Sequence, residues 1–293
     1  MKAIFYKIKI TTFIFLLLTS LPGLLHATDY YVSSTGGNDS QNGTSPATAW
    51  ASLTKVRQNA FRYEPGDRIL FNRGDVFYGF LQFSSPAVGW GGSAHSGTAN
   101  APITIGAYGS GDLPIIQYDP NDPIDPYNPN SPGDRFSRNV ILFAGLNYWV
   151  VENINFTDVV FTDVDHYGPS HNTCAIQMGY PGLDDMPTRC NYMLIKNCEI
   201  SLCGLGVVIN GDYNKVTHCN MSRFNNVKST MGTYTNTFNF EDIEDYGANG
   251  VTICGNYNEI SYNDIRDAWA ESLDFAWNGG ALADKPALIY IST

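Results

Sequence analysis

The stretch from Cys190 to Ser222 reads CNYMLIKNCEISLCGLGVVINGDYNKVTHCNMS, and it states one short phrase twice. Each copy opens on Asn-Tyr or Asp-Tyr, has a β-branched residue four positions later and an apolar residue nine positions later. The matching pairs are Asn191 and Asp212, Ile195 and Val216, and Ile200 and Met221. A phrase that returns after 21 residues predicts a repeat architecture.

Two more copies extend the repeat. They read NYWVVENINF from Asn147 and NYNEISYNDI from Asn256, so the four copies start 44, 21 and 44 residues apart. These intervals are close to multiples of 22, and a second phrase precedes three of the copies: VILFAG, GVVING and GVTICG. A fixed period of this length predicts a solenoid, in which one repeat cannot bury its apolar face without its neighbours.

The residue types select a parallel β-helix among the solenoids. Leucine-rich repeats have a similar period, but they need Leu at fixed offsets, which these copies lack. Each copy holds short β-branched segments joined by polar turns, which describes one coil of a β-helix whose coils stack about 4.8 Å apart. Equivalent side chains then form inward columns. We expect three: Val151, Ile195, Val216 and Ile260; Phe156, Ile200, Met221 and Ile265; and Ile154, Cys198, Cys219 and Asn263.

The third column leaves two states open for its cysteines. Cys198 and Cys219 would be neighbours in adjacent coils, at a Cα spacing compatible with a disulfide. The alternative, which we favour, is a buried ladder of free thiols, because Cys packs well as a small apolar residue. The other cysteines have no spacing typical of a zinc site: they are Cys174, Cys190, Cys203 and Cys254.

Composition bounds the class of protein. Of the 293 residues 43% are hydrophobic and 15% charged, so most of the chain should fold, and the 28 Gly and 18 Tyr favour strands and turns. The net charge of −11 repels polyanions, which argues against nucleic acid or anionic lipid as the main partner. We expect a monomer, and an anionic polysaccharide stays possible as a partner only through local Lys and Arg clusters or a bridging divalent cation.

The N-terminus has the features of a targeting signal. Lys2, Lys7 and Lys9 precede an apolar run centred on Phe13 to Leu18, and Leu25-His26-Ala27 offers a cleavage site. A membrane anchor is the alternative, but the run is short for a bilayer and is interrupted by Pro22. We therefore expect an exported chain that has no stable membrane insertion after cleavage.

Three stretches carry a family resemblance: YYVSSTGGNDSQNGTSPATAWASLTKV from Tyr30, GDRILFNRGDVFYG from Gly66 and PITIGAYGSGDLPII from Pro102. They are similar to the opening of secreted proteins of the pectate-lyase-like superfamily. The resemblance and the repeat together imply an all-β, right-handed parallel β-helix from about Ile69 to Leu282, with a capping helix near Ser52 to Phe61. The superfamily includes lyases, glycoside hydrolases, epimerases and non-catalytic surface proteins, so the resemblance implies no single activity.

The expected organisation has four parts: residues 1–27 a signal peptide, 28–136 the cap and first coils, 137–282 further coils with long loops, and 283–293 an atypical tail. Each 44-residue interval holds either one more irregular coil, with CAIQMG as its strand, or a long loop. The last coil lacks an obvious cap, and Pro286 removes a hydrogen-bond donor there. We expect that end to fray, as in a shortened member of its class with reduced activity.

The densest candidate site lies in EDIEDYGANG from Glu241 and NDIRDAWAESLDFAWNGG from Asn263. Paired carboxylates beside aromatic rings suit sugar hydrolysis, and the same oxygens suit Ca²⁺. The candidate catalytic residues are Asp245, Glu271 and Asp274; the candidate sugar-binding residues are Arg266, Trp269 and Trp277; and the candidate Ca²⁺ ligands are Glu241, Asp242 and Asp267. A solvated acidic rim is the alternative.

Two classes of function remain open. The first is an exported enzyme that cleaves a polysaccharide, as a hydrolase or a lyase. The second is a non-catalytic β-helix module that binds glycans or decorates the cell surface. Aromatic rings beside clustered carboxylates on a strand face would favour the first class, and scattered neutral polar residues the second.

Overall fold

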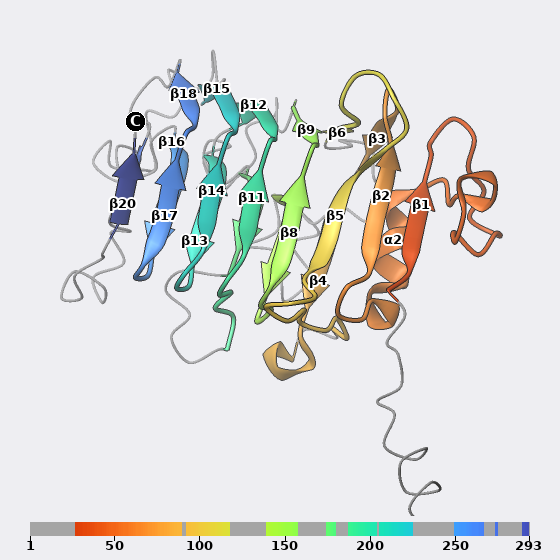
Figure 1. Cartoon of the computed structure of the whole chain (residues 1–293), viewed down its shortest axis with the longest axis horizontal. Coiled ribbons are helices and arrows are strands. Elements are labelled where there is room, and N and C mark those ends of the chain that lie inside the picture. The colour runs from red at the N-terminus through yellow and green to blue at the C-terminus, as the bar shows by residue number, and fades with distance from the viewer. Residues whose placement is uncertain are drawn as a thin grey trace, which may run out of the picture.

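The computed structural model describes residues 27–89, 92–117, 139–157, 174–179, 187–203, 205–224, 249–266, 273–274 and 289–292. The predicted signal peptide lies almost wholly outside these residues. Within them, the strands form three sheets, and every strand pairing is parallel. The chain visits the sheets in turn, so one coil takes one strand from each (Figure 1).

Sheet A contains, in spatial order, β1 (Asp29–Val32), β2 (Arg68–Asn72), β5 (Ile103–Tyr108), β8 (Trp149–Glu152), β11 (Leu194–Lys196), β14 (Lys215–Thr217), β17 (Asn258–Ser261) and β20 (Ile289–Ser292). Sheet B contains β3 (Val76–Tyr78), β6 (Ile115–Gln117), β9 (Asn155–Phe156), β12 (Glu199–Cys203), β15 (Asn220–Phe224) and β18 (Asp264–Arg266). Sheet C contains β4 (Leu81–Ser84), β7 (Asn139–Ala144), β10 (Cys174–Met178), β13 (Leu205–Asn210), β16 (Asn249–Cys254) and β19 (Leu273–Asp274).

The coil is right-handed, as predicted. In Figure 1 the strands of sheet A run upward in front, the chain crosses to sheet B at the top and returns through sheet C behind. It advances from β1 towards β20 as it does so. A right-handed crossover between parallel strands is the hand that their natural twist favours. The fold is therefore a parallel β-helix.

The first two of the inward columns predicted from the phrase are confirmed. Ile195 pairs with Val151 on one side and Val216 on the other, and Val216 pairs with Ile260. These four side chains are at most 3% exposed. The second column is also in register, through Phe156, Ile200, Met221 and Ile265. Full burial of an aliphatic side chain stabilises a fold by about 1.5–3 kcal/mol, so stacking of coils is the main source of stability here.

All six cysteines lie among the described residues, and each is a buried thiol that forms no disulfide. Cys198 and Cys219 are 2% exposed and follow β11 and β14 in adjacent coils. The structure thus has the thiol ladder rather than the disulfide. Burial raises the pKa of Cys174 and Cys190 to about 12, so both thiols are unreactive.

Each 44-residue interval is a single coil. Val151 pairs directly with Ile195, and Val216 directly with Ile260, which leaves no place for a coil between them. The alternative of an extra irregular coil is therefore wrong, and CAIQMG supplies β10 of the same coil. The added chain falls mainly between sheet B and sheet C, at residues 158–173 and 225–248.

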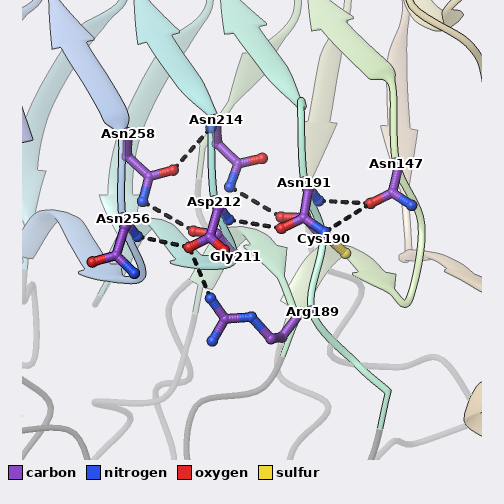
Figure 2. A network of polar contacts seen from close by, with 9 residues as sticks. All are labelled: Asn147, Arg189, Cys190, Asn191, Gly211, Asp212, Asn214, Asn256 and Asn258. Atoms are coloured by element: carbon purple, nitrogen blue, oxygen red, sulfur yellow. Dashed lines mark hydrogen bonds and ion pairs between the residues drawn. The ribbon is translucent and has the colours of Figure 1, made fainter. Parts of the chain in front are cut away.

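The corner between sheets C and A explains why each phrase begins with Asn or Asp (Figure 2). The side-chain oxygen of Asn147 accepts the Asn191 N–H at 3.0 Å, that of Asn191 accepts the Asp212 N–H at 2.8 Å, and that of Asp212 accepts the Asn256 N–H at 2.7 Å. Each side chain thereby satisfies a corner N–H of the next coil, which would otherwise lack a partner in the ladder.

A short helix, α2 (Leu53–Gln58), lies at the N-terminal end, flanked in the chain by the 3-10 turns η1 (Pro46–Thr48) and η2 (Ala60–Arg62); a third 3-10 turn, η3 (Pro86–Val88), follows β4. The Ser52 hydroxyl caps it by accepting the Lys55 N–H at 3.1 Å. The helix buries Leu53 and Val56 and contacts β4, the terminal strand of sheet C. The helix is shorter than the predicted span from Ser52 to Phe61, because the 3-10 turn η2 begins at Ala60. Its role as a cap of the β-helix remains a prediction.

The predicted limit of the β-helix at Leu282 is too early. β20, within the segment expected to be an atypical tail, pairs with β17 and extends sheet A. The backbone positions of β20 continue the inward column, with Ile291 in register with Ile260. Among the described residues, no helix has the length and apolar character needed to cross a bilayer.

Candidate functional site

Most of the predicted site lies outside the described residues: Asp245, Glu271, Trp269, Trp277, Glu241, Asp242 and Asp267. Two members can be placed. Arg266 is on β18 of sheet B, and Asp274 is on β19 of sheet C, where it is in register with Thr252. These two candidates therefore belong to different sheets, and the proposed grouping of Asp274 with Asp245 and Glu271 stays untested.

Arg266 belongs to the outward face of sheet B, which carries polar side chains in register on successive strands. Strand alternation turns Ile200, Met221 and Ile265 inward and their neighbours outward. We call two outward rows the sheet B face. The first row is Asn155, Glu199, Asn220 and Asp264; the second is Thr157, Ser201, Ser222 and Arg266.

Two carboxylates share the first row. Glu199 and Asp264 are both exposed and flank Asn220, which is in register with each of them. Because adjacent strands lie about 4.8 Å apart, the two Cα atoms are about 10 Å apart. Asp264 also forms an ion pair with Arg266 on the same strand. Carboxylates at this separation, with amide and hydroxyl groups between them, can bind the hydroxyls of one sugar unit from two sides.

The corner between sheets A and B adds two rings to this face. His218 and Tyr262 stack with their centroids 5.1 Å apart and an interplanar angle of 26°. Both rings are exposed, Tyr262 to 61%. Tyr78, which is 62% exposed, lies on β3 of the same sheet. Aromatic faces beside polar groups are a common way to hold sugars, which present C–H bonds to the ring.

A second set of tyrosines is less suited to sugar stacking. Tyr148, Tyr192, Tyr213 and Tyr257 stack at the corner between sheets C and A, with centroids 4.8–5.1 Å apart and planes within 7° of parallel. Each inner ring has both faces covered by its neighbours, so it presents only its edge to solvent. We assign this ladder a structural role, in which stacking favours the left-handed backbone of the corner.

Polar side chains on sheet A lead to His218 through a chain of contacts. Lys215 Nζ lies 2.7 Å from Glu259 Oε1, and Ser261 Oγ lies 2.7 Å from the same carboxylate oxygen. Ser261 Oγ is 3.1 Å from Thr217 Oγ1, which is 2.8 Å from His218 Nδ1. The hydrogen bonds of Lys215 and then of Ser261 hold the pKa of Glu259 below its usual range.

The described residues hold no group of three or more His, Cys, Asp and Glu side chains placed to bind a metal. The predicted Ca²⁺ ligands lie elsewhere in the chain, so the Ca²⁺ hypothesis stays a prediction. The turn from Gly36 to Gly43 looks superficially like a Ca²⁺ loop, but Asp39 uses its oxygens on the N–H groups of Ala51 and Ser52 and on the Ser52 hydroxyl. It is a turn, which its Gly, Asn, Asp and Ser residues favour.

The sequence contained a signal for Glu199 and Asp264 that local charge density did not reveal. Both occupy the position eight residues after the start of the phrase, where the copies have Asn155, Glu199, Asn220 and Asp264. This position is next to the inward residue of the second column, so alternation alone makes it outward. The density of acidic residues favoured instead the stretches that begin at Glu241 and Asn263.

No family model matches the chain. A lacto-N-biosidase of Bifidobacterium longum is 33% identical over 151 residues, which is 48% of this chain and 9% of that protein. A crystal structure of a lacto-N-biosidase from Eubacterium ramulus has 20% identity and a TM-score of 0.47, covering 80% of this chain and 41% of that one. An alginate lyase from a Paenibacillus species has 15% identity and a TM-score of 0.39, covering 72% of this chain and 63% of that one. The chain thus spans a small part of the curated relative.

Proposed function

We propose that this chain is part of an exported carbohydrate-active protein that cleaves a glycosidic bond in a polysaccharide or oligosaccharide. The observation that carries the proposal is the 33% identity with a lacto-N-biosidase over about half of the chain. The match covers 9% of that relative, so the proposal concerns only the class of reaction, which is cleavage of a glycosidic bond.

The sheet B face is the surface that we propose contacts the sugar. It combines the exposed carboxylates of Glu199 and Asp264 with the side chains of Asn220, Ser222 and Arg266. The strands of a β-helix repeat at a fixed spacing, so these groups form straight rows along the molecular axis. Rows of donors and acceptors suit an extended chain of sugar units, whose hydroxyls also recur at regular intervals.

Product analysis on a glycan panel tests the proposal. The panel should contain uronate polymers, neutral polysaccharides and an oligosaccharide that carries the lacto-N-biose unit. Hydrolysis produces saturated reducing ends, whereas a lyase produces unsaturated ends that absorb ultraviolet light. We expect hydrolysis, because the sequence relative is a biosidase.

Matched variants locate the activity on the protein. Glu199→Gln and Asp264→Asn should each lower kcat/KM at least about tenfold, the usual scale for the loss of a positioned carboxylate. Glu152→Gln is the control, since Glu152 is a partly exposed carboxylate that is ion-paired to Lys196 at 2.7 Å on sheet A. An active protein that tolerates both changes on sheet B would place its site elsewhere.

A non-catalytic glycan-binding module is the second candidate function. It is favoured by the neutral side chains between the charged residues of the sheet B face: Asn155, Thr157, Ser201, Asn220 and Ser222. Under this alternative the protein binds glycans from the panel and releases no product, and Asn220→Ala weakens binding. Cleavage of any panel member rejects it.

A further inference from the structure

Both rows of the sheet B face continue beyond β9. The first row passes through Ile115 on β6 to Val76 on β3, and the second passes through Gln117 to Tyr78. We call these four residues the β3–β6 extension. The end strands β3 and β18 lie five strand spacings apart, which is about 24 Å (Figure 1). The two rows therefore cross every strand of sheet B in a straight line.

The β3–β6 extension differs in chemistry from the rest of the rows. Val76 and Ile115 are partly exposed aliphatic side chains, whereas the same row carries Asn, Glu or Asp on each strand from β9 to β18. Tyr78 is exposed, and its side chain forms no hydrogen bond, ion pair or ring contact with another described residue. One end of the rows is thus aromatic and aliphatic, and the other end is polar and charged.

Packing of the coil does not require an aromatic residue at position 78. Phe77 is the inward residue of β3; it is 2% exposed and its ring contacts Phe71 at a centroid distance of 4.9 Å. The outward positions in register with Tyr78 on the next two strands are Gln117 and Thr157, so smaller polar residues satisfy the strand there. An exposed ring in line with hydrogen-bonding groups is typical of a ligand site.

A glycan chain has surfaces that match both ends of the rows. Its hydroxyl groups form hydrogen bonds, and the C–H faces of its sugar units pack on aromatic rings. In an extended chain one unit advances by about one strand spacing, so successive units can lie over successive strands. A disaccharide held between Glu199 and Asp264 covers only β12 to β18, whereas a chain of about six units also reaches Tyr78.

We propose that Tyr78 is a distal sugar-binding residue, whose ring stacks on a glycan chain that is also bound at Glu199 and Asp264. The inference rests on the proposed function and adds to it the class of ligand, a linear glycan of about six units that lies across the strands of sheet B. Tyr78 is three strand spacings from Glu199, about 14 Å, so it contributes affinity for long chains and takes no part in bond cleavage.

Binding of a short and a long glycan tests the proposal. The probes are the disaccharide and the linear hexasaccharide of the panel glycan that the wild type cleaves or binds. They are lacto-N-biose with para-lacto-N-hexaose, digalacturonate with hexagalacturonate, or cellobiose with cellohexaose. Calorimetry measures the dissociation constant, and KM replaces it for a probe that is cleaved. We expect the wild type to bind the hexasaccharide more tightly than the disaccharide.

Substitutions at Tyr78 show whether its ring causes this preference. Tyr78→Ala should bind the hexasaccharide about two- to tenfold more weakly than the wild type, the range for one aromatic contact. Tyr78→Phe keeps the ring and should retain the wild-type preference. Phe61→Ala is the matched control, because Phe61 is 52% exposed on η2, outside the three sheets, and its loss should change neither affinity.

The outcomes separate this inference from the proposed function. A wild type that cleaves or binds a panel glycan, with the same affinity for the hexasaccharide in Tyr78→Ala, overturns the role of Tyr78 while the proposed function stands. An equal loss for both probes also overturns it, because a disaccharide at Glu199 and Asp264 does not reach β3. A wild type that neither cleaves nor binds any panel member overturns both.

Discussion

Asn214 makes three ladder contacts from one buried position, and Figure 2 shows those with Cys190 and Asn258. Its Oδ1 accepts the Met193 N–H at 2.9 Å, its Nδ2 donates to the Cys190 carbonyl at 3.0 Å, and its own N–H is bound by Asn258 at 2.9 Å. Asn214 is 1% exposed, so water cannot replace these partners. The side chain and the backbone N–H of one residue thus join three successive coils.

Replacing Asn214 by Ala should lower the free energy of unfolding by about 2–4 kcal/mol, because it leaves a buried N–H and a buried carbonyl without partners. Urea denaturation measures the change. Asn42→Ala is the control, since Asn42 is exposed and bonds only within its own turn to the Thr44 N–H; it should cost about 0.5 kcal/mol. Similar losses in the two variants would contradict this account of the ladder.

Asp212 is the charged member of the corner ladder. Its Oδ1 accepts the Asn256 N–H at 2.7 Å and lies 2.9 Å from Arg189 NH2, in an ion pair that is about one-third exposed. Exposed pairs contribute about 0–1 kcal/mol, so the ladder bond should matter more than the charge.

Two substitutions at Asp212 separate these contributions. Asp212→Asn keeps the acceptor and should change the free energy of unfolding by less than about 0.5 kcal/mol. Asp212→Ala removes the acceptor and should cost about 1–2 kcal/mol. Thermal or urea denaturation of the pair decides the point, and a larger loss in the Asn variant would mean that the ion pair dominates.

At the scale of elements, Asp75 ties the turn after β1 to the turn before β3. It is 4% exposed and accepts the hydroxyl hydrogens of Ser33 at 2.7 Å and Thr35 at 2.8 Å. Burial by itself raises the pKa of Asp75, but the hydrogen bonds from Ser33, Thr35 and Asn72 outweigh it and leave the pKa below its usual value. The charged carboxylate is therefore the form that the folded state prefers.

A carboxyl group whose pKa is lower in the folded than in the unfolded state stabilises the fold at pH values above its unfolded-state pKa. This contribution disappears as the pH falls through the folded-state pKa. We expect the urea concentration at the unfolding midpoint of the wild type to decrease once the pH is lowered below about 4, where Asp side chains ordinarily titrate. Asp75→Asn should be less stable than the wild type at pH 7 and should lose less stability than the wild type when the pH is lowered. The exposed Asp112 supplies the control, because Asp112→Asn should follow the wild-type profile. Parallel profiles for Asp75→Asn and wild type would refute this role.

At the scale of the whole molecule, stability depends on how many neighbours a coil has. β13 lies between β10 and β16 inside sheet C, whereas β19 ends the described order of that sheet and pairs with β16. A strand with a partner on each side opens only when the stack opens, while an end strand can separate alone.

Hydrogen exchange should therefore show a gradient along the axis. We expect the amides of Leu273 and Asp274 to exchange faster than those of Val207 to Ile209, although both segments belong to sheet C. Mass spectrometry or NMR at neutral pH measures the two rates side by side. Equal protection would mean that the C-terminal coil is as firmly closed as the centre, against the expectation of fraying.

The sequence by itself determined the coil. The repeated phrase predicted the parallel β-helix and the buried columns through Ile195 and Ile200. This was possible because strand alternation and the corner turn are local, so a fixed period sets which side chains point inward. The period also implied the stacking of Cys198 near Cys219, but it could not say whether the thiols were joined.

Only the tertiary structure decided how distant segments meet. It showed that each 44-residue interval is one coil, that β20 rejoins sheet A, and that Ser261 lies against Thr217 although 44 residues separate them. A phrase with irregular spacing does not specify whether extra residues form another coil or a loop, because both satisfy the same local pattern. The Glu259–Ser261–Thr217–His218 chain and the sheet B face depend on register between coils, and register is a property of the packed stack.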